Sequence, residues 1–189
     1  MDAFAYISIV PSIIIALGLT RLLTGIGKIL ERRNQVKNYW VHIMWALNLF
    51  LYMVLNWWIL YRWNLQSMWS FPLLIFLLLT PIVTFLQSVI LFPDHIEANI
   101  DFKKHFYEDH RWFFTLAALL PPLDFLDTIL KGVPHLIAQG LIYLVTIVLI
   151  TVLSIVALLT KNQTYHKFFA VFFLVYISVF ISINLNTLV

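Results

Sequence analysis

The chain of 189 residues contains no cysteine, which excludes disulfides, thiolate metal ligands and a cysteine nucleophile. Charged residues are scarce too: they make up 11% of the chain, against about 25% in soluble domains. No basic patch is interleaved with aromatic residues, so nucleic acid is not an expected partner. By contrast, 62% of the residues are hydrophobic. This composition predicts an integral membrane protein whose main partner is the lipid bilayer.

Six apolar segments approach or exceed the roughly 20 residues that a helix needs to cross a bilayer. Lipid satisfies no backbone hydrogen bonds, and the segments lack the alternating pattern of a membrane barrel, so all six are expected to be helical. The predicted fold is therefore all-α, a bundle of six transmembrane helices that forms one domain over residues 1–189. The predicted spans are Phe4–Ile29, Trp40–Tyr61, Phe71–Phe92, Trp112–Leu130, Pro134–Thr160 and Phe168–Leu188.

Lys and Arg residues are distributed unequally between the connections of these spans. Only two lie in the second and fourth connections, Arg62 and Lys131. Because basic residues concentrate in cytoplasmic loops, this asymmetry predicts that both termini lie outside the cell. The other three connections, with the helix ends beside them, hold nine: Lys28, Arg32, Arg33, Lys37, Lys103, Lys104, Arg111, Lys161 and Lys167.

The connection between the third and fourth predicted spans, residues 93–111, is the longest polar segment. Asp94 and Glu97 resemble a capping box, with Asp in the place of Ser or Thr. They predict a short cytoplasmic helix lying on the membrane surface, with Ile100 and Phe106 among the residues that face lipid. One hypothesis for the whole protein is therefore a sensor or scaffold that docks a soluble partner through this loop. Its candidate docking residues are Asp94, Glu97, Lys103, Lys104, His105 and Arg111.

Two aspartates lie in the fourth predicted span, three residues apart and therefore on one side of the helix. Asp127 precedes Lys131 by four residues, which favours an ion pair near the outer interface. Asp124 lies deeper, just after Pro121 and Pro122, which break the helical hydrogen-bond ladder. Ionisable groups at membrane depth often mark ion or proton paths, although both acids could also lie in the interface.

Arg21 is the remaining charged residue within a predicted span. It shares a helical stripe with Gly18 and Gly25, which favours a position inside the bundle, while its long stem could also reach the headgroups. We consider a transport or channel subunit whose proton or ion path contains Arg21, Asp124, Asp127, Asn56 and Gln87 as the leading hypothesis. Such a narrow bundle would act as a homo-oligomer or as a subunit of a membrane complex.

The histidines fall mostly on the predicted cytoplasmic half. His42, His110 and His166 are candidate pH-sensing residues or ligands of haem or another metal. Their spacing matches no metal motif, so no cofactor is predicted and haem is the minority alternative. No nucleophile with a partnered base and no metalloprotease signature is found, so an enzyme is the less favoured class.

The chain resembles a group of known proteins in two stretches. They are "ALGLTRLLTGIGKILERR" near the start and "HFYEDHRWFFTLAALLPPLDFLDTILKG" in the middle. It resembles a family of small bacterial polytopic inner-membrane proteins that has no assigned activity. The resemblance implies a multi-pass protein of the bacterial inner membrane, and it assigns no functional residue.

Overall fold

The structure, a computed structural model, describes residues 3–66, 68–93 and 100–184, and most of these residues are helical. Six of its helical segments are long and apolar enough to cross a membrane, which confirms the all-α class and the number of predicted spans. The elements are α1 (Ala3–Ile7), α2 (Ile9–Glu31), α3 (Trp40–Leu60), the 3-10 helix η1 (Tyr61–Leu65), α4 (Phe71–Leu91), α5 (Phe102–Leu130), α6 (Val133–Leu159) and α7 (Gln163–Asn184).

Helix α5 begins ten residues earlier than the predicted fourth span. The side chain of Asp101 accepts hydrogen bonds from the backbone N–H groups of Lys103 (2.9 Å) and Lys104 (3.2 Å), so it caps the helix. Residues 102–111 are therefore the first turns of one long helix that continues into the fourth span, and the predicted start of that span at Trp112 is wrong. Phe106, expected to face lipid, is only 4% exposed. Asp94 and Glu97 lie outside the described residues.

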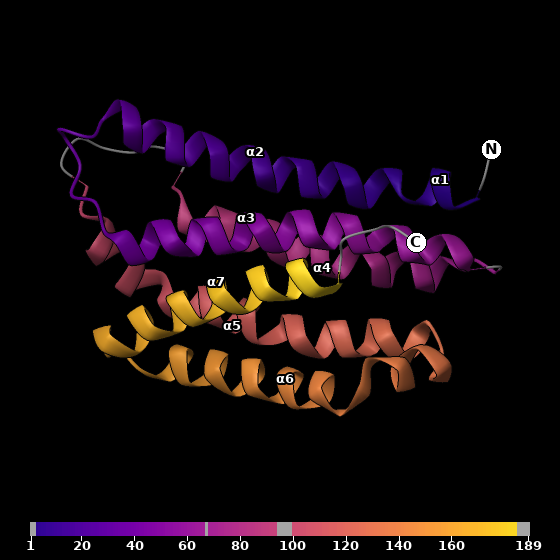
Figure 1. The fold of residues 1–189 in the computed structure, drawn as a ribbon. Coiled ribbons are helices and arrows are strands. Elements are labelled where there is room, and N and C mark those ends of the chain that lie inside the picture. The colour runs from indigo at the N-terminus through magenta and orange to yellow at the C-terminus, as the bar shows by residue number, and fades with distance from the viewer. Residues whose placement is uncertain (1–2, 67, 94–99, 185–189) are drawn as a thin grey trace.

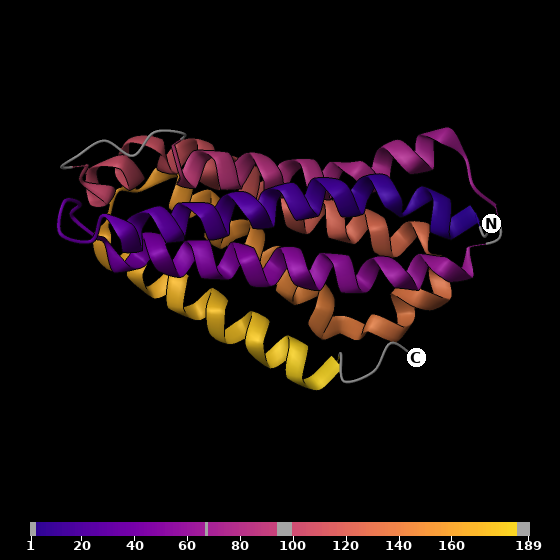
Figure 2. The same ribbon diagram turned by 90° about the horizontal axis from the view of Figure 1, so that it is seen from above.

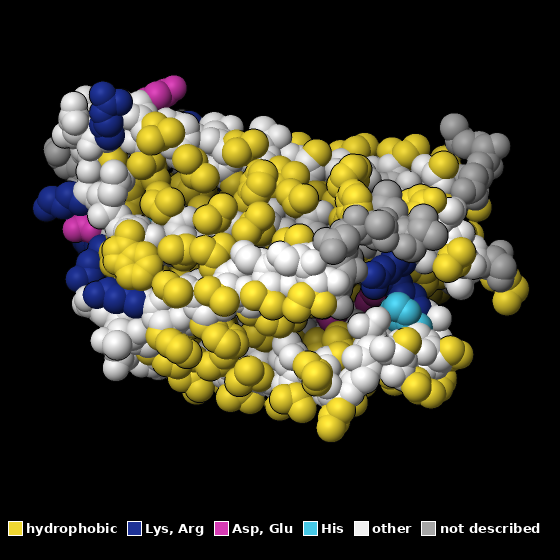
Figure 3. All heavy atoms as spheres, in the orientation of Figure 1, with side chains coloured by type: hydrophobic (Ala, Val, Ile, Leu, Met, Phe, Trp, Pro, Cys, Tyr) yellow, Lys and Arg dark blue, Asp and Glu magenta, His cyan; other side chains and the backbone are white. Residues whose placement is uncertain are grey.

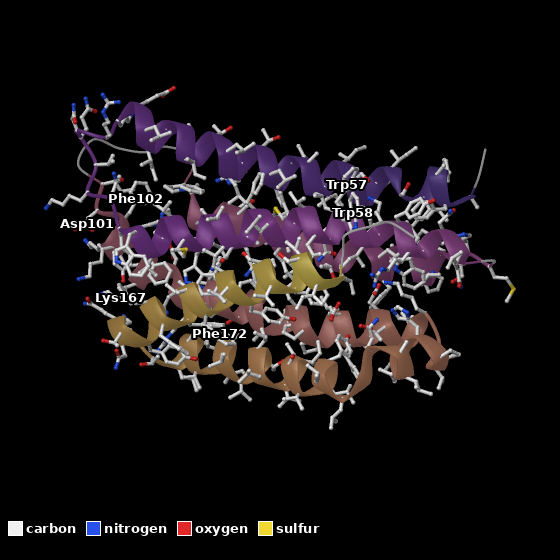
Figure 4. All side chains as sticks on the ribbon, in the orientation of Figure 1. Trp57, Trp58, Asp101, Phe102, Lys167 and Phe172 are labelled. Atoms are coloured by element: carbon white, nitrogen blue, oxygen red, sulfur yellow. The ribbon has the colours of Figure 1, made fainter. Side chains whose placement is uncertain are left out.

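The long helices run alongside one another, so their connections gather at two ends of the bundle (Figures 1 and 2). We call the end that holds residues 32–39, 92–93, 100–101 and 160–162 the basic end. Asp101 and Lys167 lie there, while Trp57 and Trp58 lie toward the opposite end (Figure 4). In space-filling view, hydrophobic side chains cover most of the face between the two ends (Figure 3). This distribution is what a lipid-facing surface requires.

Aromatic side chains fill the half of the bundle nearest the basic end. Trp45 of α3 packs edge-on against Phe114 of α5 and Phe169 of α7, with ring centroids 5.1 Å apart in both pairs. Phe113 lies 5.5 Å from the same indole. We call these four residues the aromatic plug, because they join three helices across the interior.

The glycine stripe of α2 faces the bundle interior, as the sequence suggested. A Cβ atom at Gly25 would overlap the ring of Phe92, and one at Gly18 would lie 2.5 Å from the terminal carbon of Met53. The missing side chains therefore let α2 approach its neighbours closely.

Candidate functional site

A cavity of about 140 Å³ lies inside the bundle, with walls from α3, α5, α6 and α7 and one residue of α4, Gln87. It is lined along α3 and η1 from Trp45 to Arg62, which at about 1.5 Å per residue corresponds to about 25 Å of length. We call it the central cavity. A smaller space of about 50 Å³, the side cavity, lies between α2, α3, α4 and α5. Asp124, Asp127 and Lys131 line both spaces, so the acid pair of α5 stands where the two cavities meet.

Asp127 is held in an ion pair. Lys131 donates to its Oδ2 atom, as the four-residue spacing predicted, and Trp63 Nε1 donates to its Oδ1 atom at 2.9 Å. The Lys131 ammonium also lies 5.2 Å from the centre of the Trp63 ring, within cation–π range. Both carboxylate oxygens of Asp127 thus have partners, and this group joins α5 to η1.

Asp124 has a different environment. Its Oδ2 atom accepts a hydrogen bond of 3.0 Å from the hydroxyl of Tyr143 on α6, and Thr128 lies 2.8 Å from that hydroxyl. Within the described part of the chain, no Lys or Arg nitrogen lies within ion-pair distance of this carboxylate. Asp124 is therefore an acid inside the bundle whose side-chain partner is a neutral group.

Both helices beside this acid are interrupted. Pro121 and Pro122 lie within α5, where they remove backbone donors without ending the helix. In α6, Gly140 has φ +72° and ψ 179°, which separates a short first segment from the rest of the helix. This backbone region is essentially restricted to glycine. The break places Tyr143 one turn beyond it, against Asp124.

Charged side chains surround the opening of the cavity at the end opposite the basic end. Arg62, Lys131 and His135 line this part, and His135 Nε2 lies 3.3 Å from the side-chain nitrogen of Gln139. The face drawn in Figure 3 has a hollow at this end, in which acidic, basic and histidine side chains are visible. The polar contents of the bundle are thus reachable from its surface here.

Four of the five predicted path residues line the central cavity: Asn56, Gln87, Asp124 and Asp127. Arg21 does not line either cavity. Its guanidinium instead donates to the carbonyl oxygen of Phe92 at 2.7 Å. This contact places Arg21 at the carboxyl end of α4.

Two histidines bind the same helix end. His42 Nε2 lies 2.7 Å from the carbonyl oxygen of Leu91, and His105 Nε2 lies 3.2 Å and 3.3 Å from those of Ile90 and Leu91. A carbonyl only accepts, so each ring must carry its proton on Nε2. Terminal carbonyls of a helix need such donors, and the helix dipole favours positive charge there. Arg21, His42 and His105 thus serve as caps of α4.

His110 and His166 lie together, with ring centroids 5.8 Å apart. Each already binds a backbone carbonyl at 2.8 Å, His110 that of Tyr107 and His166 that of Thr160. Neither these rings nor His42 lines the two cavities. Among the described residues no group of three His, Asp or Glu side chains is arranged to hold a metal ion. Haem or metal binding by these three histidines stays a prediction.

The remaining predicted docking residues belong to the first turns of α5. Lys103, Lys104 and Arg111 are exposed, and Lys104 lies 3.8 Å from Glu108 in a surface ion pair. His105 instead points toward the α4 end. A docking surface for a soluble partner stays a prediction.

Several site residues were not singled out from the sequence: Trp45, Tyr52, Thr128, His135, Gly140, Tyr143 and Tyr176. The tyrosines and the tryptophan carried no local signal, because aromatic residues are common at membrane interfaces. Gly140 alone carried a local sequence signal, because it is an isolated glycine in an otherwise apolar helical run.

No family model matches the chain, and no match was found among curated proteins or solved structures.

Proposed function

We propose that this multi-pass membrane protein is a transport-type subunit, and that the central cavity is the outer half of a proton or ion path with Asp124 as its exchange site. One observation carries the proposal: the carboxylate of Asp124 borders both cavities and binds the neutral Tyr143 hydroxyl, whereas neighbouring Asp127 is paired with Lys131. The two acids, three residues apart, thus have different tasks.

The energetic argument is that a carboxylate at membrane depth costs about 3 kcal/mol on insertion scales. Asp127 offsets that cost with a cation and an indole N–H. The side chain of Asp124 is instead hydrogen-bonded to a neutral hydroxyl, an arrangement suited to a site that must release what it binds. A permanent ion pair at this position would hold the transported proton or cation away.

The path is open at the end near Arg62 and closed at the other end, because the aromatic plug fills the bundle there. Transport then requires a second conformation in which the plug parts. Breaks of the kind found at Gly140 and Pro121 are typical of transporter helices, where irregular backbone lines the substrate cavity. The interrupted helices α5 and α6 are therefore the elements we expect to move.

The orientation is part of the proposal. The basic end gathers nine of the twelve Lys and Arg residues, so the positive-inside rule assigns it to the cytoplasm. The charged opening near Arg62 and His135 then faces outward. The resemblance described above adds the bacterial inner membrane as the setting.

The test is flux through purified protein in sealed vesicles that carry a pH-sensitive dye, with parallel assays for sodium and potassium. Asp124→Asn keeps the size of the side chain and should reduce the flux at least tenfold. Asp101→Asn is the matched control, since it removes an equal charge but retains a good helix cap. A wild type without flux, or a folded Asp124→Asn variant with normal flux, would contradict the proposal.

A further inference from the structure

Three residues that line the inner end of the central cavity each have a buried polar atom: the indole nitrogen of Trp45, the Oδ1 atom of Asn48 and the Oε1 atom of Gln87. Trp45 is 4% exposed, Asn48 0% and Gln87 2%. None of the three atoms has a hydrogen-bond partner in the described part of the chain. We call this group the inner polar site.

The orientation of both amides is fixed by the groups that their nitrogens reach. Asn48 Nδ2 donates to the carbonyl oxygen of Ala170 at 2.9 Å, and Gln87 Nε2 donates to that of Phe113 at 3.4 Å. Reversing either amide would set an oxygen against a carbonyl oxygen. The free atoms are therefore two acceptors from the amides and one donor from the indole.

Leaving a buried polar group unsatisfied costs about 1–3 kcal/mol, and three such groups in one cavity indicate an occupant. The occupant must donate to two amide oxygens and accept from the indole N–H. Water does both. A bare metal cation would bind the oxygens but leave the indole N–H unpaired and repelled, and an anion would be repelled by both oxygens.

The shape of the cavity agrees with this donor and acceptor pattern. A volume of about 140 Å³ distributed along the helices is a narrow passage, with room for several water molecules. A hydrated metal ion or a large organic solute needs a wider one. Polar side chains also recur along the wall, with Asn56 and Asp124 between the opening and the inner polar site.

We infer that a file of water fills the central cavity from the charged opening to the inner polar site, and that the species moved is the proton. This inference rests on the proposed function and names its substrate. A hydronium at the opening gives its proton to the Asp124 carboxylate and becomes water. Asp124 then passes that proton to a water on the inner side and returns to its ionised form. Beyond the plug, His166 packs against Phe114 with ring centroids 5.2 Å apart, and His110 lies beside His166.

Water access is tested first, because it does not depend on flux. The chain has no cysteine, so a single introduced thiol is a clean reporter. Ser154 is 1% exposed but lines the central cavity, whereas Ser88 is 0% exposed and lines neither cavity. In membranes, Ser154→Cys should react with the small aminoethyl methanethiosulfonate at least tenfold faster than Ser88→Cys. Equal, slow labelling would mean a dry cavity and would overturn the inference.

Selectivity is tested in the vesicles described above. Gln87→Met keeps the length of the side chain but removes the acceptor, together with the donor to the Phe113 carbonyl, and should lower proton flux about tenfold. Thr84→Val is the control, since Thr84 is buried on the same helix and bonds to its own backbone. Asp124-dependent sodium or potassium flux would overturn the proton assignment while leaving a transport function in place. Rapid thiol labelling without any flux would overturn the proposed function itself.

Discussion

The contact between Gly25 and Phe92 gives the sharpest prediction about packing. Alanine at position 25 would place its methyl group inside the Phe92 ring, which is 1% exposed and packs edge-on against His42 at 5.0 Å. The backbone of Phe92 is also held, because its carbonyl accepts from Arg21. The ring cannot yield without disturbing the α4 caps, so we expect Gly25→Ala to destabilise the protein by about 1–3 kcal/mol.

Two other glycines of α2 provide a graded series. At Gly18 the new methyl group would meet the flexible end of Met53, so the loss should be smaller. At Gly27 it would meet nothing within 4 Å. Because alanine is the better helix former by about 1 kcal/mol, Gly27→Ala should leave stability unchanged or raise it.

Thermal unfolding of the detergent-solubilised variants, followed by circular dichroism, measures this series. At about 2–4 °C for each kcal/mol in a chain of this size, Gly25→Ala should lower the Tm by about 2–12 °C. Gly18→Ala should fall between Gly25→Ala and Gly27→Ala. Equal melting temperatures for the Gly25 and Gly27 variants would refute the close approach of α2 to the end of α4.

Three further variants test other features. Gly140→Ala should cost about 1–3 kcal/mol, seen as a lower Tm than that of Gly27→Ala, since only glycine readily adopts the backbone at φ +72° and ψ 179°; an unchanged Tm would mean that α6 is not broken there. Asp101→Ala should speed amide hydrogen exchange at Lys103 and Lys104 about fivefold, the effect of a cap worth about 1 kcal/mol, whereas Asp101→Asn should not. Trp63→Phe removes the indole donor to Asp127 and should cost on the order of 1.5 kcal/mol in thermal unfolding, a loss absent in the exposed Trp57→Phe.

Much of the architecture follows directly from the sequence. The lengths of the apolar segments located the membrane-length helices, because a helix that crosses lipid needs about 20 apolar residues whatever it packs against. The Asp127–Lys131 pair and the inward face of the Gly18–Gly25 stripe depend only on helical periodicity, and both are present. These features are local, so a single segment contains the information.

The misplaced start of α5 has a physical cause. The charged residues between Lys103 and Arg111 lower the hydropathy of that segment, yet they lie on turns whose other face buries Phe102, Phe106 and Phe113. Hydropathy averaged over a window does not separate the two faces, whereas the cap at Asp101 marks the true beginning.

Contacts between segments far apart in the chain could not be predicted from the sequence. Arg21 reaches a carbonyl 71 residues away, and Tyr143 reaches Asp124 only because α6 is broken at Gly140. Asn48 and Gln87 come together at the inner polar site from different helices. Which polar groups share a cavity depends on how the helices pack. Residue spacing and composition within a single sequence do not reveal that packing.

The carboxyl end of α4 has a mechanical consequence. Its last carbonyl oxygens accept hydrogen bonds from side chains of α2, α3 and α5, namely Arg21, His42 and His105. Because three helices contact the same helix end, they can rotate about this point. They cannot slide past one another without breaking several hydrogen bonds at once. Any rearrangement of the bundle should therefore have its smallest amplitude near Phe92 and its largest at the far tips of the helices, beside Lys131 and His135.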